Sequence, residues 1–205
     1  MIRWPDLARL VKTLSRDERA AQLVEFAVSL PLLVVFVVGI FDFSSAFTLK
    51  QKLTNVARDA ARVAAADPSN DLLFPSTPAP ASVMEAFQTV DNYLVANKIN
   101  DCGISSSGAL VGLTWTFSGN TNGCVAGGLT VTINRGYYIP ATGATAPSVS
   151  CQSQTPGAGQ LTVVSTCVSI QYPYPWRFGR AANLLGANTM LPPFLSVVAV
   201  AMNEN

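Results

Sequence analysis

The chain has 205 residues, enough for one membrane span and one modest domain. Only 12% of its residues are charged and the formal net charge is +1, which excludes the strongly basic surface of a nucleic-acid-binding protein. The chain has no histidine, and it lacks the G-x-S-x-G, P-loop and dinucleotide-binding motifs. We therefore expect no enzymatic activity and no cofactor.

Residues 1–22 are predicted to form a short polar leader in the cytoplasm. Basic residues from Arg3 to Arg19 crowd this segment. Because basic residues beside a span favour the cytoplasmic side, they place the N-terminus inside. The basic residues between Lys50 and Arg62 weaken this asymmetry.

The next element is a predicted transmembrane helix over residues 23–47. The run FAVSLPLLVVFVVGIF extends from Phe26 to Phe41 without a charged residue. With its apolar flanks it reaches the length of about 20 residues that a bilayer core requires. Pro31 lies inside the run and is expected to kink the helix.

Two acids, Glu25 and Asp42, bracket this run. A carboxylate at a lipid boundary must be neutralised, reach water or find a cation. In one interpretation Glu25 is solvated by headgroups, with Asp42 as its counterpart across the membrane. In the other, Glu25 has a task in assembly.

The helix is predicted to continue over residues 48–66 as an amphipathic extension in the aqueous phase. Apolar residues recur there at steps of three and four, which is a helical pattern, and include Leu49, Leu53, Val56 and Ala60. This stripe packs either against the chain's own sheet, which we favour, or against partner subunits. Asp67 and Pro68 end the helix.

A proline-rich linker over residues 67–81 precedes an exported α+β domain over residues 82–205. The domain starts with a short helix, for which Ser82 and Glu85 suggest a capping box. Its apolar face comprises Val83, Phe87, Val90 and Leu94. Strands follow at residues 110–117, 129–134, 161–172 and 194–202, and the alternation in LTVTIN predicts one buried and one wet face. The fold class is therefore α+β, with two helices before a mainly antiparallel sheet.

All four cysteines, Cys102, Cys124, Cys151 and Cys167, lie in this distal domain. An even number on one side of a span suggests two disulfides in an oxidising compartment. Of the three possible pairings we favour Cys102–Cys124 with Cys151–Cys167, because both close short loops; buried free thiols are the alternative. No zinc or other metal site is expected, since histidine is absent and the cysteine spacings do not fit.

The stretch AAQLVEFAVSLPLLVVFVVGIFDF, followed by LKQKLTNVARDAARVAAA, resembles the TadE-like family. This family comprises bitopic pseudopilins of the tight-adherence, or Flp-type, pilus machinery. The resemblance is strongest over residues 16–66. It combines V-E-F at the start of the span, L-P early within it, Asp42-Phe43 at its exit and N-x-A-R-x-A-A-R beyond it. The resemblance also implies a pilin-like fold.

The resemblance implies processing by a prepilin peptidase. Glu25-Phe26 fits the motif of its sites, and cleavage would fall between Ala20 and Ala21, although Ala20 stands where glycine is usual. Ala21 would then carry a new α-ammonium group, and Glu25 would become the fifth residue. In pilins this carboxylate meets the N-terminal amine of a neighbouring subunit, so the resemblance implies that Glu25 guides assembly.

The expected function is that of a structural minor pseudopilin in a tight-adherence pilus or secretion assembly, acting in initiation, at the tip or in anchoring. Its expected partners are membrane lipid, other pilin or pseudopilin subunits, the inner-membrane assembly platform and prepilin peptidase. We expect it in the bacterial inner membrane, with its C-terminal domain periplasmic or extracellular. One alternative is a signal-anchored periplasmic binding or sensor domain. Another is a secreted protein released at Ala64-Ala65-Ala66.

Overall fold

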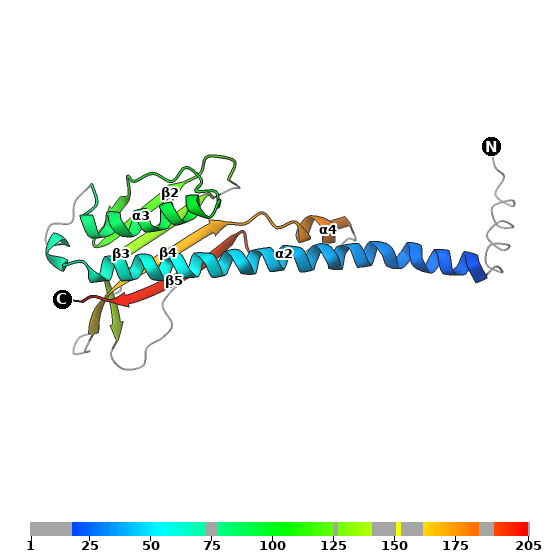
Figure 1. The fold of residues 1–205 in the computed structure, drawn as a ribbon, viewed down its shortest axis with the longest axis horizontal. Coiled ribbons are helices and arrows are strands. Elements are labelled where there is room, and N and C mark those ends of the chain that lie inside the picture. The colour runs from blue at the N-terminus through cyan, green and yellow to red at the C-terminus, as the bar shows by residue number, and fades with distance from the viewer. Residues whose placement is uncertain are drawn as a thin grey trace. The chain divides into compact units, whose positions relative to one another are not determined.

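A computed structural model describes residues 18–72, 78–124, 127–140, 151–152, 162–184 and 191–204 (Figure 1). The expected fold class is confirmed: a long N-terminal helix and a shorter helix precede a five-stranded antiparallel sheet. The elements are α2 (Glu18–Ala66), the 3-10 helix η1 (Ser69–Leu72), α3 (Ala81–Ala96), β1 (Ala109–Val111), β2 (Thr114–Gly119), β3 (Leu129–Pro140), β4 (Thr162–Pro173), α4 (Phe178–Leu184) and β5 (Phe194–Met202).

The chain divides into two compact units. The first unit comprises Met1–Ser44 and Trp176–Leu191, and the second comprises Ser45–Pro175 and Pro192–Asn205. Helix α2 contributes to both, and it is helical throughout, Pro31 included. It ends at Ala66, directly before Asp67 and Pro68, because a residue before proline disfavours helical geometry.

The sheet of the second unit is a meander with the strand order β1-β2-β3-β4-β5, in which all neighbours are antiparallel. The prediction of one strand over residues 110–117 is wrong, because Gly112 and Leu113 form a two-residue hairpin between Val111 and Thr114. Gly112 has a φ of +61°, which glycine adopts readily. In β3 the predicted alternation holds up to Ile133, since Leu129, Val131 and Ile133 are buried and the threonines between them are half-buried. It fails at Asn134, which is fully buried on the face predicted to be wet and whose side chain donates to the Cys151 carbonyl.

The apolar stripe on the C-terminal half of α2 is buried within the second unit. Leu53, Val56 and Ala60 have no exposed surface, and Leu49 is half-buried. The favoured interpretation, that this stripe packs within the chain's own domain, therefore holds. Alanines on the same face allow neighbouring backbone to approach closely.

Helix α3 buries its predicted apolar face, Val83, Phe87, Val90 and Leu94, in the same core. The ring centroids of Phe87 and Phe117 lie 4.5 Å apart. The predicted capping box is wrong: Pro80 occupies the N-cap, no side chain caps the helix, and Ser82 is buried inside the first turn. Proline has no side-chain acceptor for the amides of the first turn, and its backbone carbonyl instead accepts from the amides of Val83 and Met84.

A buried arginine ties three distant segments of the second unit together. Arg135 is fully buried where the register of β3 shifts between Asn134 and Tyr137, which is a β-bulge. Its guanidinium donates to Thr166 Oγ1 in β4 at 3.2 Å and to the carbonyl of Asp67, just beyond α2, at 3.0 Å. Asn203 donates to the Arg135 carbonyl and accepts from the Thr166 hydroxyl. The hydrogen bonds of Arg135 at the bulge thus connect the end of α2 and the residues after β5 to the sheet.

The pKa of Asp91 on α3 is raised above its ordinary value of 3.8 by burial and by the neighbouring charge of Asp101. The folded state therefore holds this proton more tightly, and stability is lost as pH rises through the raised pKa. We expect Asp91→Asn to raise the melting temperature at neutral pH, because the variant has no carboxylate to ionise. The two proteins should melt alike below the ordinary pKa of 3.8.

Circular dichroism of the full chain in detergent would measure this effect at both pH values. Asp59→Asn is the matched control, because Asp59 is an exposed acid on α2. If Asp91→Asn lowered the melting temperature at neutral pH, or left it unchanged, the assigned cost of ionisation would be wrong.

Candidate functional site

The first unit has an apolar surface larger than a water-soluble protein normally exposes. Between Leu23 and Phe43, α2 exposes large apolar side chains on every turn. Among the described helices, it is the one long and apolar enough to cross a membrane, and only 6% of its most apolar stretch is buried. A core helix would be mostly buried, so this arrangement indicates a single-pass membrane anchor.

Glu25 lies at the N-terminal boundary of this surface. Its side chain is exposed, as is the neighbouring Phe26. No described side chain forms an ion pair or hydrogen bond with it. Ala20 and Ala21 precede it in the first turns of α2, which begins at Glu18.

Asp42 lies at the other boundary and is not the solvated counterpart of Glu25. It is only 6% exposed. Its Oδ2 accepts the backbone amides of Arg177 and Phe178, both at 2.8 Å. These amides open α4, so the carboxylate satisfies donors that a helix start leaves unpaired and opposes the positive end of the helix dipole. Asp42 is therefore a structural acid in the first unit.

An aromatic cluster surrounds this contact. The Phe43 ring lies 5.2 Å from that of Trp176 and 5.6 Å from that of Phe178, between centroids. Gly39, one turn before Asp42, is buried, and a Cβ there would lie 2.9 Å from Cδ2 of Phe178. Neither α4 nor this aromatic cluster was predicted from the sequence. The sequence signal that could have indicated this contact is Gly39, followed three residues later by Asp42, near the end of the apolar run.

We expect Asp42→Ala to release α4 from the last apolar turn of α2. Two hydrogen bonds to a charged acceptor are lost together, which should weaken the contact by about 1–2 kcal/mol. Hydrogen exchange of the full chain in detergent would show faster exchange over residues 177–184. Asp59→Ala is the control and should leave this exchange unchanged. Equal protection in wild type and Asp42→Ala would contradict the capping role.

The four cysteines form two local pairs in the second unit, the pairing that the sequence favoured. The Cα atoms of Cys102 and Cys124 are 5.5 Å apart, and those of Cys151 and Cys167 are 5.6 Å apart. No described cysteine is free. The second pair is buried beside Tyr137.

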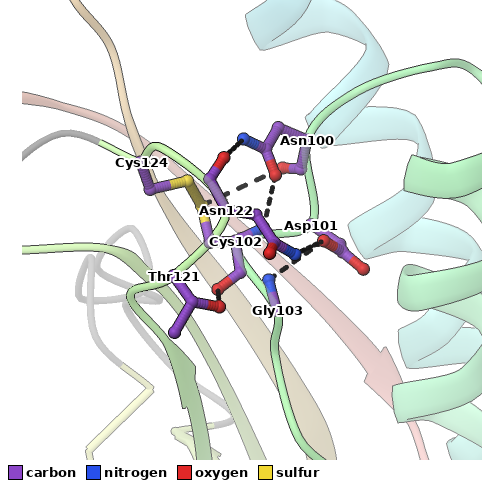
Figure 2. The surroundings of a disulfide bond; sticks show 7 residues. All are labelled: Asn100, Asp101, Cys102, Gly103, Thr121, Asn122 and Cys124. Carbon is purple, nitrogen blue, oxygen red and sulfur yellow. Dashed lines mark hydrogen bonds between the residues drawn. A yellow bond between two sulfur atoms is a disulfide. The ribbon is translucent and has the colours of Figure 1, made fainter.

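Figure 2 shows the polar loop around the first disulfide. Asn100 Oδ1 accepts the amide of Cys102, and Asp101 Oδ1 accepts the amide of Gly103, both at 2.9 Å. The Thr121 amide and hydroxyl both donate to the Cys102 carbonyl. These bonds hold Cys102 at a φ of +56°, which is uncommon for a residue other than glycine. These hydrogen bonds stabilise the fold of the loop. Among the described residues, no cluster of side chains could bind a metal ion.

A family model described as TadE-like protein matches residues 20–62. The expected resemblance is therefore confirmed over the apolar part of α2 and most of its amphipathic extension. No curated protein and no solved structure was found to match the chain.

Proposed function

We propose that this chain, which carries a TadE-like segment at residues 20–62, is a structural minor pseudopilin of a Tad pilus or secretion assembly. In this role it is held in the inner membrane by α2 and acts in initiation, at the tip or in anchoring. The observation that carries the proposal is the exposed Glu25 at the start of an apolar helix whose large side chains are exposed from Leu23 to Ile40. Lipid or the helices of other subunits must cover that surface.

Glu25 would set the register between subunits. Prepilin peptidase would cut between Ala20 and Ala21, and the new α-ammonium group of Ala21 would pair with Glu25 of a neighbouring subunit. Removing one partner of a desolvated ion pair costs about 3–5 kcal/mol, so a mismatched register would be strongly disfavoured. The basic leader would keep the N-terminus in the cytoplasm until cleavage, with the second unit exported.

Glu25→Gln tests this role, since it keeps the size of the side chain and removes its charge. We expect the amount of this protein in sheared surface fractions to fall at least about tenfold, because the ion pair is lost. Its amount in the membrane should stay the same. Asp59→Asn, an equal charge change at an exposed site on the same helix, should assemble normally. A Glu25→Gln protein that assembled like wild type would exclude the register role.

The alternative is a signal-anchored periplasmic binding or sensor domain without a filament role. The compact, disulfide-bonded second unit supports it, since such a unit does not require a polymer. In that case neither wild type nor Glu25→Gln would enter the sheared fraction, and both would stay with the membrane.

A further inference from the structure

The segment from Trp176 to Leu184, here called the exit segment, lies at the last turn of the apolar run. Its amides bind Asp42, and Phe178 packs on Gly39. The twenty residues from Leu23 to Asp42 rise about 30 Å in a helix, close to the thickness of a bilayer core. A span that begins at Leu23 therefore brings the exit segment to the far membrane–water interface.

The exposed charge of the exit segment is positive. Asp42 is buried and its carboxylate faces the backbone amides, whereas Arg177 and Arg180 are exposed. The sequence has no acid between Asp101 and Glu204, so no carboxylate follows these arginines within their segment. Two exposed guanidinium groups at this level are complementary to the phosphates of anionic phospholipids.

The aromatic residues of the segment suit the same level. Trp176 and Phe178 are half-buried against Phe43, which is itself 47% exposed. Tryptophan is enriched at membrane interfaces, because one end of its ring system is apolar and the other donates a hydrogen bond. Half-buried aromatic rings next to exposed arginines are the combination of side chains that an interfacial anchor uses.

We propose that the exit segment is an interfacial lipid-binding anchor that fixes the depth of α2. Trp176 and Phe178 lie at headgroup level, and Arg177 and Arg180 bind anionic phospholipids. The Asp42 cap holds the segment against α2, so the depth of the helix and the position of the segment are set together. This anchor does not depend on the pilus assignment, since any single-span protein of this structure would use it.

Depth-dependent fluorescence quenching tests the position. The full chain is reconstituted in vesicles of phosphatidylcholine and phosphatidylglycerol, brominated either high or deep in the acyl chains. The emission of Trp176 is isolated by subtracting that of Trp176→Phe. We expect the high bromines to quench this difference signal at least about twofold more than the deep bromines, as for an interfacial ring. Stronger quenching by the deep bromines, or none by either, would overturn the proposal.

Native mass spectrometry tests the arginines. The protein is released from the same mixed vesicles, and the phosphatidylglycerol retained on it is counted. Each basic residue near an anionic surface strengthens binding by about fivefold, so Arg177→Gln with Arg180→Gln should reduce retention strongly. Arg58→Gln with Arg62→Gln is the matched control, because Arg58 lies about 24 Å farther along the helix than Asp42.

Unchanged retention in the exit-segment variant, or an equal loss in the control, would show that the arginines do not bind lipid phosphates. Both measurements use the isolated chain without partner subunits. Their failure would leave the Glu25 assembly test untouched, and failure of the Glu25 test would not affect them.

Discussion

Replacing Arg135 with alanine should lower the free energy of unfolding of the second unit by about 3 kcal/mol or more. The side chain is fully buried, so its removal leaves a cavity. It also leaves Thr166 Oγ1 and the Asp67 carbonyl without their guanidinium donors. Since these acceptors lie on β4 and just after α2, the loss should loosen the end of α2 from the sheet.

Urea unfolding of the full chain in detergent, followed by circular dichroism, measures the Arg135 effect. Arg58→Ala is the control, because Arg58 is exposed on α2 and should change stability by less than about 0.5 kcal/mol. An Arg135→Ala protein as stable as this control would show that the buried network contributes little. Hydrogen exchange at residues 60–66 would identify the released segment.

Removing the buried disulfide with Cys151→Ala and Cys167→Ala should destabilise the second unit by about 3 kcal/mol or more. The crosslink closes a loop of 16 residues, and opening it restores conformational freedom to the unfolded chain. Both sulfur atoms are also lost from a buried cluster with Tyr137, which adds a packing term. The effect should therefore exceed that of removing Cys102 and Cys124.

The Cys102–Cys124 disulfide provides the comparison. It closes a loop of 22 residues, so its entropic contribution is similar at about 3 kcal/mol. Hydrogen bonds accepted by Asn100 and Asp101 and donated by Thr121 hold the same loop without it, and they should offset part of the loss. Urea unfolding of the two double variants, with and without reductant, measures the difference. A larger effect for Cys102 and Cys124 would contradict this account.

The sequence predicts elements that depend on local pattern. Local patterns show whether an element, or which face of it, is buried in the domain. The uniformly apolar run from Phe26 to Phe41 is mostly exposed, as expected of a membrane span, whereas the stripe through Leu53 and Val56 and the apolar positions from Leu129 to Ile133 are buried. The hairpin at Gly112 was missed, because strand-forming residues flank it and conceal a single turn glycine. Such a hairpin depends on the φ angle of a single residue, and the composition of the segment does not indicate that angle.

Features that depend on distant contacts were not predictable in the same way. Asp42 meets Phe178 across 136 residues of sequence, and Arg135 meets Asp67 across 68. No periodic pattern links such pairs, and α4 has only 7 residues, too few for a helical period to be read. The sequence placed Asp42 at the membrane boundary without indicating its burial, and it led to no prediction for Arg135. Their roles follow only from the acceptors and donors that the fold brings to them.

The intact mass of the protein extracted from membranes tests the central claim, that α2 remains part of the mature chain as its membrane anchor. We predict a chain that requires detergent, begins at Ala21 and carries both disulfides, each of which removes two hydrogens from the mass. A chain that begins at Met1 would keep the anchor, but it would exclude the proposed cleavage and with it the ion pair between Ala21 and Glu25. A soluble chain that begins at Asp67 would contradict the account, because the apolar helix would then be a discarded export segment.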